Sequence, residues 1–281
     1  MWLSQKSYLE QILIHLGADN LTPCQTPMEA GLDLRKPTSD YVATKDKIRK
    51  FQTAIGSLMY AAIVTRPDLA FAVNKLSQFA SNPDDSHFAA LKRLFRYVAG
   101  TVDLALRYDG DGSHPILNGW SDADWAGDKV DRKSQGAYTF FSNNCLISWS
   151  SKKQPTVALS SCEAEYMALT QSTKEAVWLQ QLMADVGQQQ SGPTTICGDN
   201  KGSLALAHDP AFHARVKHID IQHHFIREKV EDNIVEVKFV PSNEMVADGL
   251  TKALPRPAFE QFINLLNMDN RWMKKATENN D

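Results

Sequence analysis

Four acidic residues stand at positions where their carboxylates could act together. They are Asp122 in WSDADWAGD, Glu165 in SSCEAEYMAL, Asp199 in TICGDNKG and Asp248 in MVADGLTKAL. Hard oxygen ligands of this kind select Mg²⁺ or Mn²⁺. Two such ions about 3.5–4 Å apart can activate a water and stabilise the leaving oxygen of an in-line displacement. If the fold gathers the four carboxylates, the sequence predicts metal-dependent phosphodiester chemistry, with nucleic acid as the substrate class.

A carboxylate cluster of this kind is unfavourable unless cations bind to it. Two like charges about 4 Å apart repel by roughly 4 kcal/mol at an effective dielectric constant of 20. Any one of the four residues, taken alone, is better explained as an ordinary acidic residue on the surface. The four together, each at the end of a different expected element, favour a functional cluster.

The elements expected around these residues are short strands and helices in a mixed α/β order. Apolar and β-branched runs predict strands over residues 116–122, 136–143, 145–151, 194–199 and 234–240. Helical periodicity predicts helices over residues 160–186, 200–207 and 216–230. Asp122 and Asp199 then fall at strand ends, and Glu165 falls in the first turns of the long helix. Asp248 begins a helix after the last strand. Ligands in such layers bind where strand ends meet helix starts.

The first 108 residues predict a mainly helical region. Apolar residues recur at helical spacing over residues 5–16, 46–64, 67–79 and 83–99, and a proline-containing connection covers residues 20–45. On the last of these helices Lys92, Arg93 and Arg96 lie away from the apolar stripe. They are predicted to form a basic face that grips nucleic-acid phosphates, although an ordinary solvated surface explains them equally well.

The composition is ordinary for a globular protein. Of the 281 residues, 43% are hydrophobic and 22% are charged, and the formal net charge is −3. There is no apolar run of about 18 residues and no secretory signal pattern at the N-terminus. The four cysteines form no CxxC pair, so reduced thiols and a cytoplasmic or nuclear location are expected. Length alone favours about two domains.

Many separate sequence phrases occur together in one order. SDADWAGD, ISWSSKKQPTVALSSCEAEYMAL, DNKGSLALA and VPSNEMVADGLTKAL stand between residues 115 and 254. LSQKSYLEQIL, FQTAIGSLMYAAIVTRPDLAFAV and HFAALKRLFRYVAGT precede them. The later phrases resemble the ribonuclease H domain of copia-type (Ty1/copia) long-terminal-repeat retrotransposon Pol polyproteins. The earlier phrases resemble the reverse transcriptase thumb and connection of the same polyproteins. The resemblance covers nearly the whole chain.

The resemblance implies three regions. A mainly helical thumb/connection-like region covers residues 1–108, and an α/β ribonuclease H-like domain with a mixed five-stranded sheet and flanking helices covers residues 109–254. A C-terminal helix and a polar tail cover residues 255–281.

The resemblance also implies an activity. The expected enzyme is an endonuclease that hydrolyses the RNA strand of RNA/DNA hybrids with two Mg²⁺ ions, for which Mn²⁺ can substitute. The family's catalytic and metal-binding acids fall on Asp122, Glu165, Asp199 and Asp248. The expected partners are the hybrid, recognised by its shape and its 2′-hydroxyls, and other Pol segments such as the palm and fingers. No membrane partner is expected.

The sequence departs from related enzymes in two places. Cellular ribonucleases H often carry a His in the loop before the last Asp, and the corresponding PSNEMV has none, which leaves the proton-transfer group unassigned. The Tyr-x-Asp-Asp of the polymerase palm is also missing, so the chain resembles a C-terminal piece of the polyprotein and is not expected to polymerise DNA. The alternative is a non-catalytic remnant that binds nucleic acid or protein. A resolvase or integrase core is a weaker possibility.

Several further residues are candidate neighbours of the site. Lys152, Lys153 and Asn200 are predicted nucleic-acid contacts, although a solvated loop explains the two lysines equally well. Asp124, His218 and His224 could support the metal ligands from behind. A zinc site at His218, His223 and His224 is disfavoured, because their spacing is not i, i+4. Trp120, Trp125 and Trp149 are expected to pack in or beside the sheet.

Overall fold

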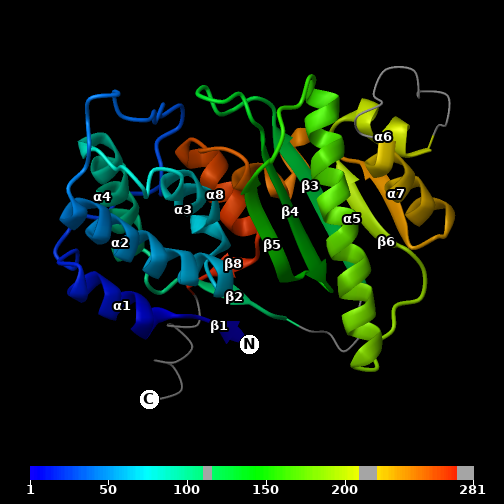
Figure 1. Ribbon diagram of the computed structural model, residues 1–281. Coiled ribbons are helices and arrows are strands. Elements are labelled where there is room, and N and C mark those ends of the chain that lie inside the picture. The colour runs from blue at the N-terminus through cyan, green and yellow to red at the C-terminus, as the bar shows by residue number, and fades with distance from the viewer. Residues whose placement is uncertain (110–115, 209–219, 271–281) are drawn as a thin grey trace, which may run out of the picture. The chain divides into compact units, whose positions relative to one another are not determined.

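The computed structural model of the protein describes residues 1–109, 116–208 and 220–270. The chain divides into two compact units (Figure 1). The first unit combines Met1–Tyr108 with Lys252–Asp281, and the second unit is Asp109–Thr251. Each unit contains its own sheet and its own helices.

The first unit is mainly helical. Its helices are α1 (Lys6–His15), α2 (Lys45–Val64), the 3₁₀ turn η1 (Pro67–Leu69), α3 (Ala70–Ser77), α4 (Asp85–Ala99) and α8 (Arg256–Leu265). A small antiparallel sheet has the order β1-β2-β8. Its strands are β1 (Trp2–Leu3), β2 (Ala105–Arg107) and β8 (Met268–Asp269). The helical periodicity of the sequence therefore predicted this region correctly.

Side-chain caps fix where these helices begin. The Thr44 hydroxyl accepts a hydrogen bond from the Lys47 backbone N–H at the start of α2. At the start of α4, Asp84 accepts from the His87 backbone while the His87 ring accepts from the Asp84 N–H, which is a reciprocal capping box. Gly17 takes a left-handed φ of 65° just after α1, a conformation that ends a helix and suits glycine.

The described part of the C-terminal segment belongs to the first unit. The Phe259 ring of α8 meets the Tyr97 ring of α4 edge to face, with centroids 5.5 Å apart. The short strand β8 pairs with β2. The sequence led us to expect a helical extension following the ribonuclease H-like domain, and it could not show which unit this helix joins. Residues 271–281 of the expected polar tail lie outside the described residues.

A buried ion pair holds the first unit together at η1. The Arg66 guanidinium donates to both carboxylate oxygens of Asp68, at 2.9 and 2.7 Å, and both side chains are fully buried. Arg66 also donates to the carbonyl and the hydroxyl of Thr101, at 2.9 and 2.7 Å. The Tyr97 hydroxyl donates to Asp68 at 2.8 Å. The TRPD phrase of the sequence therefore encodes a hydrogen-bonded buried charge pair.

The second unit is built on a five-stranded mixed sheet of order β5-β4-β3-β6-β7. The strands are β3 (Leu117–Asp124), β4 (Gln135–Ser142), β5 (Cys145–Lys153), β6 (Thr194–Gly198) and β7 (Val235–Phe239). The first three are antiparallel neighbours, whereas β6 runs parallel to both β3 and β7. Crossovers that contain helices connect the parallel strands, as parallel pairing requires.

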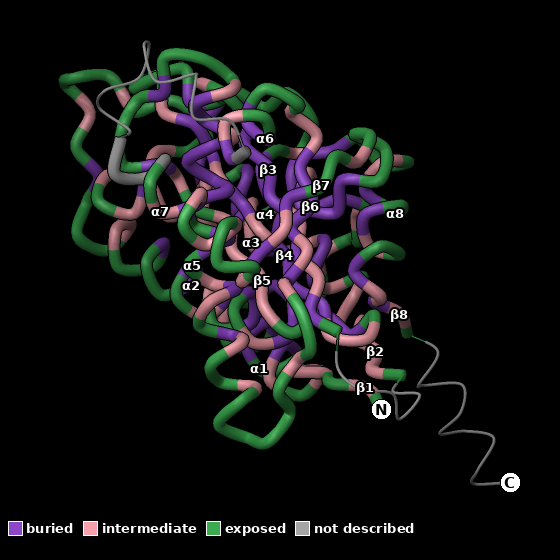
Figure 2. Tube along the Cα trace, turned by 90° about the vertical axis from the view of Figure 1, so that its right-hand side faces the viewer, coloured by how far each residue is buried: buried purple, intermediate pink, exposed green. Residues whose placement is uncertain are grey.

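Helices cover this sheet and enclose its core. They are α5 (Ser161–Asp185), α6 (Lys201–His208) and α7 (Asp220–Glu231), and the 3₁₀ turns η4 (Ser242–Glu244) and η5 (Val246–Leu250) follow β7. Side chains from β3, β4, β6, β7 and the three helices form one buried cluster, which includes Leu117, Phe140, Tyr166 and Ile196. Figure 2 shows the central strands mostly in the colour of buried residues.

This arrangement confirms the predicted α/β fold class with a ribonuclease H-like mixed five-stranded sheet and flanking helices. Two local expectations differ from the structure. Asp248 lies within a 3₁₀ turn rather than at the start of an α-helix, and β3 extends two residues beyond Asp122. The four cysteines are free. No helix in the described parts of the chain combines the length and the apolarity that a membrane span requires.

Candidate metal centre

The pairing of β3 with β6 brings two of the predicted acids to one edge of the sheet. The strands are parallel, and Trp120 of β3 lies opposite Cys197 of β6. Asp122 and Asp199 each follow these partners by two residues, so the register carries both carboxylates to the same level. Because parallel strands end at the same edge, residues distant in sequence meet there.

The third acid comes from the first turns of α5. Ser160 caps this helix by accepting from the Glu163 N–H at 3.2 Å, and the Glu163 carboxylate accepts from the Leu159 N–H at 2.8 Å. Glu163 is thereby used as a capping residue and points away from the cluster. Ala164 packs against Ala123 in a small buried group, which places Glu165 beside the end of β3.

Asp122, Glu165 and Asp199 form the candidate metal centre. Each residue offers one carboxylate oxygen, and these atoms all lie within 4.8 Å of one another. Asp122 is buried, whereas Asp199 is partly exposed. Oxygen donors at this spacing fit a hard divalent cation, because such a cation can bind several carboxylates at once.

The electrostatics of the cluster follow from its burial and its like charges. Burial, and then the charges of Asp122 and Asp199, raise the pKa of Glu165 to about 9, although a hydrogen bond from the Ala123 backbone opposes the shift. The charge of Asp248 raises this pKa as well. The cluster without a cation therefore retains a proton on Glu165 at neutral pH. A divalent cation would take the place of that proton.

Asp248 lies near the other three acids but is not one of the three mutually close ligands. It belongs to η5 and influences Glu165 through its charge. Whether all four acids bind metal, as predicted, is not tested by this geometry.

Two hydroxyl groups orient the carboxylates, and neither was singled out from the sequence. The buried Thr251 hydroxyl donates to Asp122 Oδ2 at 2.7 Å. The Ser242 hydroxyl donates to Asp199 Oδ2 at 2.7 Å. Both residues belong to the VPSNEMVADGLTKAL phrase, which was the available signal that this segment contacts the site.

Asp124 is the last residue of β3 and lies two residues beyond Asp122. Alternation along a strand places both side chains on the same face of the sheet. The Asp124 carboxylate also fills the space beside Gly127, where a Cβ would lie only 2.0 Å from Oδ2. Its predicted supporting role at the metal ligands stays a prediction.

The predicted phosphate contacts are largely engaged within the chain. Lys153 pairs with Asp128 at 2.7 Å and with Asp131 at 2.8 Å, while Lys152 is exposed. The Asn200 side-chain oxygen accepts from the Ser203 N–H at 3.0 Å and thereby caps α6. These positions do not test whether the residues contact nucleic acid.

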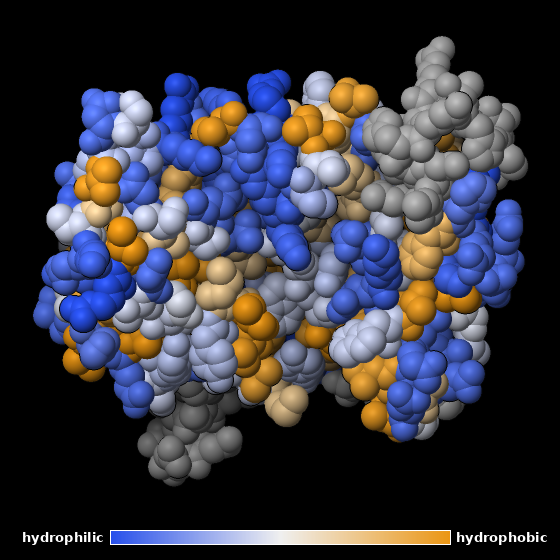
Figure 3. Space-filling view, viewed as in Figure 1, coloured by the Kyte–Doolittle hydropathy of each residue, from blue (hydrophilic) through white to orange (hydrophobic). Residues whose placement is uncertain are grey.

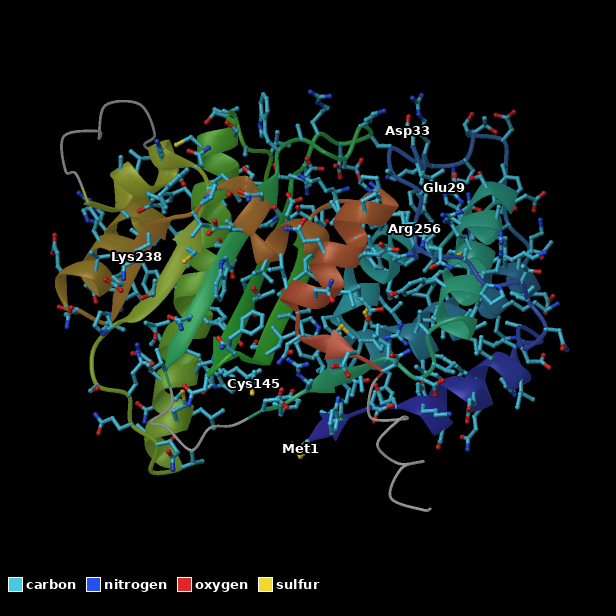
Figure 4. All side chains as sticks on the ribbon, turned by 180° about the vertical axis from the view of Figure 1, so that it is seen from behind. Met1, Glu29, Asp33, Cys145, Lys238 and Arg256 are labelled. Carbon is cyan, nitrogen blue, oxygen red and sulfur yellow. The ribbon has the colours of Figure 1, made fainter. Side chains whose placement is uncertain are left out.

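The basic residues of α4 differ from one another in the same respect. Arg93 pairs with Glu29, labelled in Figure 4, at 2.8 Å and also donates to Thr26. Arg96 donates to the Thr22 carbonyl at 2.7 Å. Only Lys92 is exposed among the three. The predicted continuous basic face is therefore partly used to hold the connecting segment that precedes α2.

The histidine candidates are not placed in the centre. His218 lies outside the described residues. His224 is exposed, and its Nδ1 lies 3.5 Å from Arg227. The described residues show no zinc-like grouping of histidines.

The tryptophans have different environments. The Trp120 ring packs edge to face on Phe141 with centroids 5.3 Å apart, as expected. The expectation of packing is wrong for Trp125, which is 47% exposed.

Comparison with known proteins places the chain among transposon polyproteins. It is 42% identical over 273 residues to the retrovirus-related Pol polyprotein from transposon TNT 1-94 of Nicotiana tabacum, covering 95% of this chain and 20% of that protein. It is 40% identical over 263 residues to the corresponding polyprotein from transposon RE1 of Arabidopsis thaliana, covering 93% of this chain and 18% of that protein. The chain thus spans about a fifth of the length of these relatives. No family model matches it.

Two further similarities are more limited in extent. Secreted RxLR effector protein 161 of Plasmopara viticola is 53% identical over 129 residues, which cover 46% of this chain and 90% of that protein. Among solved structures, LC11-RNase H1 in complex with an RNA/DNA hybrid has a TM-score of 0.37 at 13% identity, covering 48% of this chain and 93% of that chain.

Proposed function

The chain belongs to the copia-type family of retrovirus-related Pol polyproteins, and from this premise we propose that its second unit is a metal-dependent nuclease that hydrolyses the RNA strand of RNA/DNA hybrids. One observation carries the proposal. Carboxylate oxygens of Asp122, Glu165 and Asp199 lie within 4.8 Å of one another at the ends of two parallel strands and the start of a helix. Asp248 completes the proposed set of four acids.

The donor set fits two Mg²⁺ ions, with Mn²⁺ as a substitute. All the proposed ligand atoms are carboxylate oxygens, which hard divalent cations prefer. When bound, two such cations generate a nucleophilic water at neutral pH and stabilise the leaving oxygen of an in-line displacement.

The chain's own residues prepare the ligands for this role. Thr251 and Ser242 each hold one carboxylate oxygen, so Asp122 and Asp199 keep their orientation before a cation binds. Hydrogen bonds of this kind commonly change metal affinity by about 10- to 100-fold. Glu165 gives up its proton as a cation binds, because its pKa is raised to about 9 in the cation-free cluster.

The proposed substrate is a hybrid duplex recognised by shape and by the 2′-hydroxyl groups of the RNA strand rather than by base sequence. The remaining Pol segments, including the palm and fingers, are the proposed protein partners.

The direct test is cleavage of a hybrid labelled on the RNA strand, with Mg²⁺ or Mn²⁺, by the purified chain. We expect cleavage of the hybrid RNA, no cleavage of double-stranded DNA and loss of activity in Asp199→Asn. Asp185→Asn is the matched control, because Asp185 is an exposed acid of the same unit at the end of α5. If a folded chain binds the hybrid but never cleaves it, the non-catalytic binding remnant becomes the better explanation.

A further inference from the structure

An exposed apolar surface lies in the two loops that border the metal centre. Trp125 is 47% exposed, Val157 is 45% exposed and Leu159 is 74% exposed. Figure 3 shows hydrophobic groups at the surface around the start of α5, at the upper end of that helix in this view. Single exposed apolar residues are common on soluble proteins. Three from two loops beside one cluster of carboxylates are a grouping that calls for a ligand.

Contacts tie this surface to the backbone that carries the metal ligands. The Trp125 indole N–H donates to the Ala158 carbonyl at 3.1 Å, which joins the two loops. The Ala158 side chain packs with Ala123 and Ala164 in a small buried cluster. Ala123 follows Asp122 directly, and Ala164 precedes Glu165 directly. The apolar surface is therefore fixed next to two of the proposed metal ligands.

The loop after Trp125 is held in an unusual conformation. Ala126 has a φ of 52°, which L-residues other than asparagine and aspartate rarely adopt. The Ala126 N–H donates to the Ser134 hydroxyl at 3.1 Å, and Lys153 holds Asp128 farther along the loop. Strained backbone persists only where its surroundings enforce it, and such strain clusters at ligand-binding sites. Little ordering is then needed when a ligand meets the indole.

We propose that Trp125, Val157 and Leu159 form a surface on which the sugar face of a nucleic-acid strand packs beside the carboxylates; this rests on the proposed function. The bases of a duplex are stacked and the phosphates are charged, so the sugars offer the uncharged C–H groups that match an apolar side chain. The surface positions the strand without reading its bases.

Binding is measured first, in an Asp199→Asn background in which the substrate stays intact. The probe is a fluorescently labelled RNA/DNA hybrid, followed by anisotropy in Mg²⁺. Aromatic contacts with nucleotides are typically worth enough that Trp125→Ala should raise the Kd about tenfold. Trp125→Phe should stay within about threefold of the parent, because an aromatic face remains. Trp178→Ala is the matched control, since Trp178 is 55% exposed on α5, and it should leave the Kd unchanged.

Kinetics then separate positioning from a general structural role. With all four acids intact, Trp125→Ala should raise KM about tenfold and leave kcat within a factor of about two, in line with lost ground-state binding. Leu159→Ala, at an exposed loop position, should raise KM in the same direction and guards against misfolding of the tryptophan variant. An equal loss of kcat and kcat/KM would overturn the proposal.

The outcomes also distinguish this inference from the proposed function. Cleavage with unchanged Kd and KM in the Trp125 and Leu159 variants would overturn the surface and leave the nuclease standing. A chain that binds the hybrid through Trp125 without cleaving it would support the surface and remove the nuclease. A chain that neither binds nor cleaves would overturn both.

Discussion

Glu165→Gln removes the carboxyl that we expect to exchange a proton for a metal ion. Burial and two neighbouring carboxylates raise the pKa of Glu165 to about 9. At pH 7 the metal-free carboxyl is then protonated by roughly 100 to 1. Because a carboxylate binds metal only when deprotonated, each binding event at pH 7 should release about one proton. The association constant should rise about tenfold per pH unit between roughly pH 5 and pH 9, and level off above that range.

Calorimetric titration with Mn²⁺ measures this release directly. Titrations at pH 7 in two buffers with different ionisation enthalpies give the number of protons, about one for the parent and near zero for Glu165→Gln. The affinity of the variant should fall farthest below that of the parent near pH 9, where the parent carboxylate is free to bind. Glu231→Gln, at an exposed acid of α7, is the matched control and should behave like the parent. Metal binding by the parent without proton release would refute the reasoning.

The same pKa fixes the sign of a stability effect in the metal-free protein. The folded-state pKa lies above the model value of 4.5, so this contribution to stability is fully present below pH 4.5 and is lost between pH 4.5 and about 9. The slope is at most about 1.4 kcal/mol per pH unit for one proton. Urea denaturation in a chelator at pH 6 and pH 8 should show the parent losing stability relative to Glu165→Gln. A parallel pH dependence in both proteins would contradict the assignment.

Three further substitutions probe other parts of the structure. Thr251→Val removes the buried hydroxyl that donates to Asp122, so the Mn²⁺ affinity measured by calorimetry should fall about tenfold without unfolding, whereas Ser242→Ala at the exposed bond to Asp199 should cost less. Asp68→Ala leaves the buried Arg66 charge unpaired and should lower the free energy of unfolding by about 3–5 kcal/mol; a loss below about 1 kcal/mol would count against the buried pair. Gly127→Ala puts a Cβ 2.0 Å from Asp124 Oδ2 and must displace that carboxylate, so the melting temperature should fall by several degrees in a thermal scan, as expected for a loss of about 1–3 kcal/mol.

The strands and helices that carry the acids were predictable because their signals are local. Apolar runs bounded by turn residues marked β3 and β6, and Ser160 marked the start of the long helix by its capping position. Once Asp122 and Asp199 were placed at strand ends, the tendency of α/β layers to bind ligands at that edge supplied the rest. The equal offset of both residues from the Trp120–Cys197 pair required the register itself.

Contacts between distant side chains could not be predicted in the same way. Thr251 and Asp122 are 129 residues apart, and their hydrogen bond depends on how η5 packs against the sheet. The pairing of Arg93 with Glu29 likewise depends on the path of a connection that has no periodic pattern. Trp125 was misjudged because composition around a strand end indicates an aromatic residue without showing which side of the loop it faces.

The two units bury charge in different ways, and the difference bears on function. In the first unit the Arg66 guanidinium meets the Asp68 carboxylate through two hydrogen bonds, and Thr101 and Tyr97 supply the rest of the network. The pair is thereby compensated within the chain, as a buried charge requires. In the second unit, negative charge near Glu165 is strong enough to raise its pKa to about 9, so a proton is held where a charge would otherwise stand. A carboxyl that holds a proton this tightly, and that shares a 4.8 Å cluster with two other acids, is poised to exchange that proton for a divalent cation. The structure of the first unit thus serves stability, whereas the cluster in the second unit accepts a cost in stability that a bound metal ion would remove.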